Sequence, residues 1–223
     1  MQRLKKDVLK MQAGAIKTWR SRTDSIIIKV DSIEIIVSPK VFEPKPDSIL
    51  LAKKMGIKPG EIVLDTCAGS GIQTIYAATV KGAGKVYSCD INPYAVANIK
   101  LNVRKHNLGK IVKVFRANLF PEGKTYFDVI VSNPPYTDHK SKDIVEKSVW
   151  DEKHKTLKHL LKDAPKYLKP EGKMYISWAN FADFGLFEKL ARVYKYHYRK
   201  IASRKDPADS RIEYRVYKLI PQY

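Results

Sequence analysis

A glycine-rich turn between a short apolar run and a helical segment constrains the fold of this chain more than any other feature. Residues 62–64 (Ile-Val-Leu) form the apolar run, and the sequence Asp-Thr-Cys-Ala-Gly-Ser-Gly follows at 65–71. Gly69 and Gly71 allow a tight turn and a close approach of the backbone to a ligand. We expect a buried strand at 62–64 and a helix at about 72–79, because glycines between two such segments are typical of a turn from a strand into a helix.

The same alternation of strand and helix patterns continues toward the C-terminus. We expect further strands at 85–89, 112–115, 127–131, 173–178, 194–203 and 211–220, and further helices at 93–106, 150–168 and 183–193. Alternating elements of this kind favour a parallel sheet covered on both faces, and the last two strands favour an antiparallel hairpin at one edge. The sequence therefore predicts an α/β fold with a doubly wound, Rossmann-like sheet of seven strands, mostly parallel.

The first 40 residues have a different pattern. Residues 1–20 are expected to form a helix with Leu4, Val8, Met11 and Ala15 on one face. Two β-rich runs at 25–30 and 33–37 suggest a hairpin, and the proline-rich stretch 38–48 is expected to be a loop before a helix at 48–56. We therefore divide the chain into an N-terminal extension at 1–40 and a main domain at 41–223.

Charge is concentrated at the two ends of the chain. The formal net charge is +19, from 42 Lys and Arg against 23 Asp and Glu. Residues 1–29 carry eight basic side chains against two acidic ones, and residues 189–223 carry ten against three. Such an excess favours a polyanionic partner such as RNA, because each phosphate contact releases condensed counterions. A lysine-rich surface that only keeps the protein in solution is the alternative.

Composition excludes several classes of protein. Hydrophobic residues make up 44% of the chain, which is enough for a substantial core. No apolar run approaches the roughly 18 residues that span a bilayer, and no apolar run follows the basic N-terminus as in a secretory signal. Cys67 and Cys89 have no spacing typical of a zinc site or a disulfide framework. We expect a cytoplasmic protein without a metal site or a membrane partner.

The glycine-rich turn also predicts a nucleoside-binding site. Asp90 lies 19 residues beyond Gly71, at the end of the next strand, where its carboxylate can accept hydrogen bonds from both ribose hydroxyls. The dinucleotide fingerprint is incomplete because Thr74 occupies the place of its third glycine. Asp65 would repel a pyrophosphate but suits a positive amino group. S-adenosylmethionine, with an adenosine end and an ammonium end, meets these requirements, and a tight turn without a ligand is the alternative.

The sequence Ser-Asn-Pro-Pro-Tyr at 132–136, after the strand expected at 127–131, indicates a site for a planar amino group. The nitrogen of a base amine or a carboxamide is a poor nucleophile because its lone pair is delocalised. The side-chain oxygen of Asn133 and the backbone carbonyl of Pro134 can both accept from such a group and localise its lone pair. Tyr136 can stack on the planar target. The amine can then attack a sulfonium methyl in line; a rigid surface turn is the alternative interpretation.

These two motifs resemble those of the class I S-adenosylmethionine-dependent methyltransferases, in particular the small-domain, amino-methylating group with an Asn-Pro-Pro-Tyr motif. The resemblance runs from about residue 41 to residue 173, and residues 41–48 look like the segment that helps to close the site in that group. It implies catalytic roles for Asn133, Pro134 and Tyr136. The residues that it implies for binding S-adenosyl-L-methionine are Asp65, Cys67, Ala68, Gly69, Gly71, Asp90, Ile91 and Asn118.

Two positions depart from the pattern of this group. Cys67 stands where many members have the first glycine of the loop, and Asn118 stands where an acidic residue usually bonds the adenine. Outside the motifs, His154 and His159 have no carboxylate partner at ligand spacing, so we expect them at the surface. The polar segment 137–150 is expected to be either a lid over the substrate or a mobile loop.

The resemblance and the charge together predict methyl transfer to an exocyclic amine of an RNA base, adenine N6 or guanine N2, in tRNA or rRNA. Three alternatives stay open at this point: an N5-glutamine methyltransferase of a peptide-release factor, a DNA adenine-N6 methyltransferase, and a catalytically silent RNA-binding subunit. The sequence leaves the oligomeric state undetermined.

Overall fold

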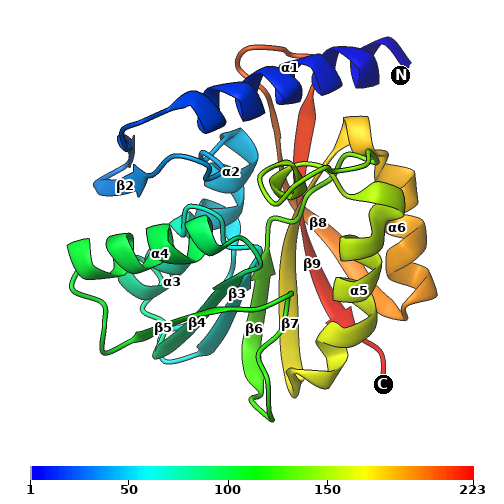
Figure 1. Cartoon of the computed structure of the whole chain (residues 1–223). Coiled ribbons are helices and arrows are strands. Elements are labelled where there is room, and N and C mark those ends of the chain that lie inside the picture. Colours follow the sequence, from blue (N-terminus) through cyan, green and yellow to red (C-terminus); the bar gives the residue numbers. More distant parts are fainter. Residues whose placement is uncertain (1) are drawn as a thin grey trace.

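The expected alternation of strands and helices is present in the computed structural model, which describes residues 2–223. The strands of the main sheet are β3 (Ile62–Thr66), β4 (Lys85–Asp90), β5 (Val112–Arg116), β6 (Phe127–Ser132), β7 (Leu168–Ala179), β8 (Tyr196–Lys205) and β9 (Glu213–Pro221). Their spatial order is β5-β4-β3-β6-β7-β9-β8 (Figure 1). The first five run parallel, whereas β9 is antiparallel to both β7 and β8. The predicted fold class is confirmed.

Helices cover both faces of this sheet (Figure 1). They are α2 (Pro46–Lys54), α3 (Ile72–Thr79), α4 (Pro93–Lys105), α5 (Lys155–Asp163) and α6 (Phe184–Val193), with short 3-10 turns η1 (Glu146–Ser148), η2 (Glu152–His154), η3 (Ala164–Lys166) and η4 (Asn180–Ala182). In Figure 1, α2, α3 and α4 lie on one side of the sheet, and α5 and α6 lie on the other. The carboxyl ends of the parallel strands therefore meet between two layers of helices.

Two sequence expectations in this region are wrong. The helix expected at 150–168 is shorter, because Lys153 and His154 have positive φ angles of 55° and 52° before α5, and Pro165 follows its last turn. The strand expected at 173–178 begins five positions earlier, at Leu168. The register between β6 and β7 passes from Phe127 opposite Leu168 to Val129 opposite Lys173, so the extra residues of β7 bulge out of the ladder.

The N-terminal segment forms α1 (Gln2–Ser21) and the antiparallel pair β1 (Ile26–Val30) and β2 (Ile33–Val37). The predicted helix and hairpin are confirmed, but the buried face of the helix is rotated from the one expected. Its buried residues are Leu4, Val8, Gln12, Ile16 and Trp19. Met11 is 53% exposed. The rotation follows from Ile16 and Trp19, which pack against residues beyond position 140 that the local pattern does not reveal. The division at residue 40 stays a prediction.

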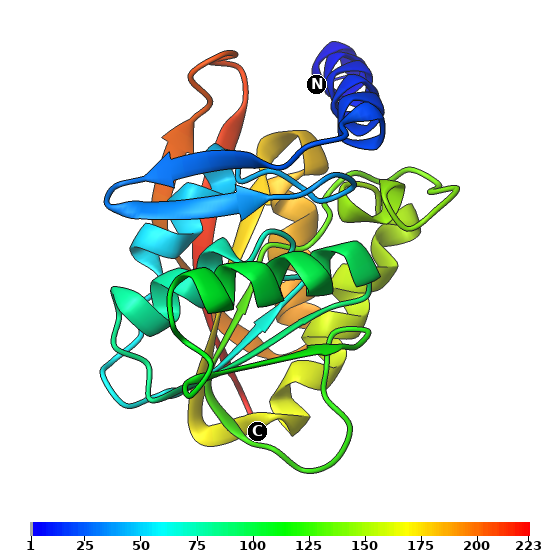
Figure 2. The same cartoon turned by 60° about the vertical axis from the view of Figure 1, so that its left-hand side comes forward.

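The hairpin is fixed to α4 by two buried amides, and Figure 2 shows it beside that helix. Asn102 Oδ1 accepts a hydrogen bond from the Ile36 amide at 2.8 Å, and Asn98 Oδ1 accepts one from the Ser38 amide at 2.8 Å. The side-chain nitrogens of Asn98 and Asn102 both donate to the Ser70 carbonyl, at 3.0 and 2.9 Å. Because Ser70 belongs to the glycine-rich turn, the hairpin also holds that turn in place.

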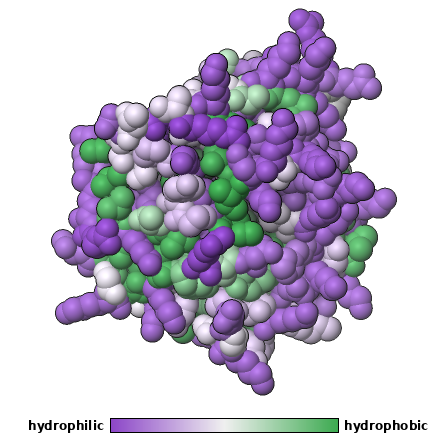
Figure 3. All heavy atoms as spheres, in the orientation of Figure 1, coloured by the Kyte–Doolittle hydropathy of each residue, from purple (hydrophilic) through white to green (hydrophobic). Residues whose placement is uncertain are grey.

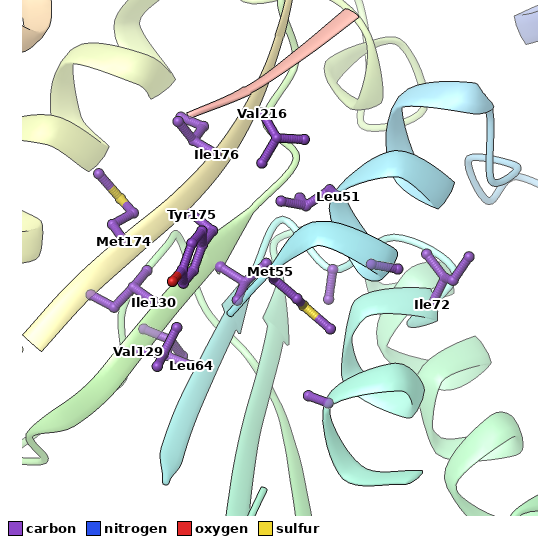
Figure 4. Packing of buried hydrophobic residues seen from close by; sticks show 14 of the residues in the cluster. Leu51, Met55, Leu64, Ile72, Val129, Ile130, Met174, Tyr175, Ile176 and Val216 are labelled. Atoms are coloured by element: carbon purple, nitrogen blue, oxygen red, sulfur yellow. The ribbon is translucent and has the colours of Figure 1, made fainter. Parts of the chain in front are cut away.

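The core between α2 and the sheet is apolar and fully enclosed. Figure 4 shows Leu51 of α2 and Met55, which follows the helix, on the same side of the sheet as Tyr175 of β7 and Val216 of β9; all four side chains are buried. Burying such side chains stabilises the fold by about 1.5 to 3 kcal/mol each. Within residues 2–223, no helix is both long and apolar enough to cross a membrane.

Candidate active site

The glycine-rich turn between β3 and α3 requires three left-handed backbone conformations. The φ angles are +56° at Cys67, +54° at Gly69 and +85° at Gly71. A Cβ atom on Gly71 would lie 3.3 Å from Ile99 Cγ1 of α4, which is tighter than an ordinary contact. Glycine is therefore needed at 71, whereas Cys67 holds the strained conformation in spite of its side chain, at a cost of about 1 to 2 kcal/mol.

Asp90, at the end of β4, holds the turn by its carboxylate. Its Oδ2 accepts from the Gly69 amide at 2.9 Å, and its Oδ1 accepts from the Asn92 amide at 2.8 Å. Burial raises the pKa of Asp90 above its ordinary value, and these backbone donors oppose that shift. Each oxygen has a second lone pair. The carboxylate can therefore also accept hydrogen bonds from a ribose, as the sequence predicts.

Asp65 lies beneath the turn. Its side chain is 1% exposed, its Oδ2 accepts from Thr74 Oγ1 at 2.5 Å, and its Oδ1 has no hydrogen-bond partner within residues 2–223. Burial raises the pKa of Asp65 to about 7. A buried carboxylate oxygen without a donor attracts a cationic group nearby. This is the property expected of a residue beneath the ammonium end of S-adenosylmethionine.

Asn133, just after β6, has its carboxamide orientation fixed by Asp47 of α2. Asn133 Nδ2 donates to Asp47 Oδ2 at 3.2 Å and to Ser48 Oγ at 3.0 Å. An ionised carboxylate only accepts, so the nitrogen of the amide has to face it and the oxygen has to face away. The sequence motif identified Asn133, but the contact with Asp47 spans 86 positions and left no local pattern.

Two hydroxyl groups surround the Asn133 side-chain oxygen. Ser177 Oγ of β7 and the Tyr136 hydroxyl both lie within hydrogen-bond reach of Oδ1. The Tyr136 hydroxyl also reaches Asp47 Oδ2 at 2.8 Å and Ser177 Oγ at 2.7 Å. A hydroxyl donates only one hydrogen bond. Because Ser177 and Tyr136 both reach the Asn133 oxygen, an amino group would bind that oxygen in place of one of these two donors.

The Tyr136 ring is buried against the wall of the site. It is 6% exposed and meets the Trp178 ring edge-on, with centroids 5.2 Å apart. Burial, with a smaller contribution from Asp47, raises the pKa of Tyr136 well above its ordinary value, so the phenol stays protonated. The ring lines the cavity but its hydroxyl already serves the Asn133 network. Stacking of Tyr136 on a planar acceptor stays a prediction.

A single cavity of about 810 Å³ connects the turn to the Asn-Pro-Pro-Tyr motif, which is large enough for a nucleoside cofactor and an acceptor group. The predicted site residues on its wall are Cys67, Ala68, Gly69, Asp90, Ile91, Asn118, Asn133, Pro134 and Tyr136. Asp65 and Gly71 are not on this wall and lie behind the turn. In Figure 3, apolar atoms gather in the middle of the face below α1 and are surrounded by hydrophilic ones.

The N-terminal helix closes one side of this cavity, which the sequence did not predict. Met11, Gln12, Ala15 and Trp19 of α1 line it. The side chain of Gln12 is buried and bridges two parts of the segment after the motif: Nε2 donates to Thr137 Oγ1 at 2.9 Å, and Oε1 accepts from the Trp150 indole at 3.0 Å. The one sequence signal that could have indicated such a contact is a glutamine at position 12, four positions from both Val8 and Ile16.

The segment 137–150 is folded against α1. Arg20 of α1 forms ion pairs with Asp143 and with Glu146, the latter at 3.0 Å. A separate apolar cluster fills the space between the two segments and consists of Ile16, Trp19, Val145, Val149 and Trp150. In the structure this segment is part of the cavity wall, and the lid and the mobile loop both stay predictions.

The histidines of the same region differ from each other. His159 is partly exposed, as expected, but the expectation that it lacks a carboxylate partner is wrong, because it pairs with Asp163, four positions on, at 3.1 Å. The expectation for His154 is wrong, because its side chain is 8% exposed and its ring lies 5.9 Å from that of Trp178. The Asp151 carboxylate accepts from two backbone amides of α5, and the tight turn that this requires directs His154 inward. Burial lowers the pKa of His154 below its ordinary value.

Known proteins share both sequence and fold with this chain. A protein of Methanocaldococcus jannaschii named as a putative N5-glutamine methyltransferase is 40% identical over 111 residues, which cover 50% of this chain and 55% of that protein. The release factor glutamine methyltransferase of Buchnera aphidicola is 29% identical over 191 residues, which cover 78% of this chain and 67% of that protein. The chain thus spans about half to two thirds of the length of these relatives.

Among solved structures, the 16S rRNA guanine-N2 methyltransferase of T. thermophilus, in complex with AdoMet and guanosine, superposes with a TM-score of 0.67. It is 19% identical, and the match covers 89% of this chain and 50% of that chain, so the likeness concerns the fold. The sequence matches the family described as "Methyltransferase small domain" over residues 33–205, which include the glycine-rich turn, Asp90 and the Asn-Pro-Pro-Tyr motif. This chain belongs to the methyltransferase small domain family.

Proposed function

We propose that this protein transfers a methyl group from S-adenosyl-L-methionine to an exocyclic amino nitrogen of an RNA base, adenine N6 or guanine N2, in tRNA or rRNA. The observation that carries transfer to a planar amino group is the fixed carboxamide of Asn133 on the wall of the cavity that the glycine-rich turn also lines. Methyl transfer is the chemistry of the family; the acceptor class is the proposal.

The residues around the turn fit S-adenosylmethionine. Asp90 would accept from the ribose hydroxyls, and the turn at Gly69 would bring backbone close to the methionine part. The unpartnered oxygen of Asp65 would favour the ammonium group electrostatically. Ile91 and Asn118 lie on the wall where the adenine would pack. When bound, the group supplies an electrophilic methyl on a sulfonium.

The Asn133-Pro134 pair prepares the acceptor. The Asn133 oxygen and the Pro134 carbonyl would accept hydrogen bonds from the two N–H bonds of a planar amine, which draws its lone pair out of conjugation. Both Pro134 and Pro135 restrict the backbone at this point, so the acceptors are already in place before the substrate arrives. Alignment of the nitrogen with the methyl then contributes a large part of the rate.

Charge at the mouth of the cavity supports a nucleic acid as the acceptor. Lys140 and Lys147 lie on the cavity wall, are exposed, and form no salt bridge within the described residues 2–223. The formal net charge of +19 adds a long-range attraction for phosphate. We place the protein in the cytoplasm, where tRNA and rRNA are available to it.

The test offers S-adenosylmethionine with a labelled methyl group separately to total RNA, DNA and protein. We expect label in RNA, with methylated adenine or guanine after digestion to nucleosides, and no label with Asn133→Ala. Label only in DNA or only in protein would contradict the RNA proposal and leave the methyltransferase assignment intact.

Glutamine methylation of a peptide-release factor is the second candidate, favoured by the 40% identity to a protein named as a putative N5-glutamine methyltransferase. The Asn133-Pro134 pair cannot by itself distinguish a carboxamide from a base amine, because both present a planar NH₂. Incubation with a purified release factor and mass analysis of its glutamine residues decides between the two candidates.

A further inference from the structure

Helix α1 lies outside the part of the chain that matches the family, which begins at residue 33. It nevertheless supplies part of the wall of the cavity through Met11, Gln12 and Trp19. Figure 1 shows α1 lying across the end of the molecule at which the strands β3 and β6 finish. An element that is added to the family fold and lies beside the site of methyl transfer is well placed to select the acceptor.

Three sets of contacts hold α1 over the cavity. Gln12 bridges Thr137 and Trp150, and Arg20 pairs with Glu146. At the other end of the helix, Asp7 accepts from Arg211 of the β8–β9 loop at 3.0 Å. These contacts come from segments far apart in the sequence, so α1 is fixed over the cavity at both ends.

The outer face of α1 is a stripe of cations. Arg3, Lys6, Lys10 and Lys17 recur at helical spacing on the side opposite the buried residues, and all four are exposed. Arg3 and Lys17 are 14 positions apart, or about 21 Å along the helix. Asp7 is the only acidic residue of α1 and is already paired with Arg211.

None of these four cations is neutralised within the part of the chain that the structure describes. No carboxylate of residues 2–223 forms a salt bridge with any of them, in contrast to Arg20 of the same helix. A row of free cations about 21 Å long matches a chain of phosphates better than a single anion. Since an α-helix is about 10 to 12 Å across, a backbone held on the outer face would pass about one helix diameter from the cavity.

We propose that α1 is the RNA-docking element of this enzyme. Its outer cations bind the phosphate backbone of the acceptor RNA, and its inner face completes the pocket that receives the target base. This inference rests on the proposed function, because both require RNA as the acceptor.

The experiment compares two full-length variants with the same change in charge. One replaces Arg3, Lys6, Lys10 and Lys17 by glutamine, which preserves helix propensity. The matched control replaces Lys54, Lys58, Lys110 and Lys124 by glutamine. These control lysines are exposed, and all lie near the amino ends of the parallel strands, away from the cavity. Binding of fluorescently labelled total tRNA is measured by anisotropy at several salt concentrations, and cofactor binding is measured by calorimetry.

We expect the α1 variant to bind tRNA at least about tenfold more weakly, with a salt dependence reduced by about three in the slope of log K against log salt. The control is expected to change binding less than about threefold, and both variants are expected to bind the cofactor like the wild type. Equal weakening in both variants, no weakening in the α1 variant, or a wild type that does not bind tRNA would overturn the inference.

Failure of the proposed function gives a different result. In that case tRNA binding still depends on the α1 cations, but the wild type transfers label to a release factor and none to RNA. If RNA is labelled and the two variants bind and methylate it alike, the proposed function stands and the role of α1 is disproved.

Discussion

The carboxylate of Asp47 accepts a hydrogen bond from the side-chain nitrogen of Asn133 at 3.2 Å, across 86 positions of sequence. This contact decides which end of the Asn133 amide is available to a substrate. A carboxylate cannot donate, so the amide oxygen faces away from Asp47. In the reaction that we propose, this oxygen accepts from the substrate, so the Asn-Pro-Pro-Tyr motif would depend on a residue of α2 outside the motif.

Replacing Asp47 by asparagine removes this constraint, because the new amide can either donate or accept. We expect kcat to fall about 10- to 100-fold, in proportion to the loss of a hydrogen bond to a charged group, while the Kd of the cofactor changes little. Steady-state kinetics and calorimetry check both. Asp31→Asn is the matched control, since Asp31 also accepts from a tyrosine hydroxyl, that of Tyr76 at 2.7 Å, but does not line the cavity. An equal loss of kcat in both variants would contradict the positioning role.

The pKa of Asp65, raised to about 7 by burial, makes stability depend on pH. Between the ordinary pKa and pH 7 the folded state retains a proton that the unfolded chain has lost, so stability falls as pH rises through this range. We expect the free energy of unfolding to fall by about 2 kcal/mol more between pH 5 and pH 7 in the wild type than in Asp65→Asn. Urea unfolding at both pH values measures this difference; parallel pH dependence in the two proteins would disprove it.

Gly71 is expected to tolerate no side chain. A φ of +85° is unfavourable for alanine, and an added Cβ would lie only 3.3 Å from Ile99. We expect Gly71→Ala to cost about 1 to 3 kcal/mol and to weaken cofactor binding, as measured by denaturant unfolding and calorimetry. Gly14→Ala is the control, because an added Cβ at Gly14 of α1 would meet no atom within 4 Å and should contribute about 0.5 to 1 kcal/mol of stability. The same sign in both variants would refute this account.

Cys67 is not a glycine, yet it keeps a left-handed φ of +56°. We expect Cys67→Gly to preserve cofactor binding and to change stability by less than about 1 kcal/mol, because relief of strain and the entropy of glycine oppose each other. Cys67→Val should be destabilised by more than about 1 kcal/mol, because a branched side chain disfavours this conformation. Thermal unfolding with and without cofactor separates the effect on stability from the effect on cofactor binding. Equal stability of the glycine and valine variants would contradict backbone strain at position 67.

Much of the fold and of the candidate site could be predicted because local sequence specifies it. The turn at Gly69 and Gly71 needs a backbone conformation that glycine adopts most readily, and the strands on either side are short apolar runs. The carboxyl ends of parallel strands meet at one edge of a sheet, so the sequence alone predicts Asp90 and Asn133 in one site. Both line the same cavity.

Residues whose surroundings come from distant segments are predicted poorly. The local sequence predicts a surface position for His154, because it gives no sign of the contact with Trp178. The helix expected at 150–168 is longer than the observed α5. The left-handed backbone conformations of residues 153 and 154, which come before α5, have no signature in side-chain periodicity. Such features depend on how α5 packs against β7, and a local pattern cannot encode that packing.

By itself, the sequence determined the fold class, the turn, the Asn-Pro-Pro-Tyr motif and the position of the charge, because each depends on backbone preferences or residue types within a few positions. Only the tertiary structure showed that Asp47 orients Asn133 and that Gln12 holds α1 over the cavity. It also showed that an ion pair between Asp7 and Arg211, 204 positions apart in sequence, links the two basic ends of the chain. Contacts over such separations form only when the sheet and its helices pack together, so their chemistry belongs to the folded protein.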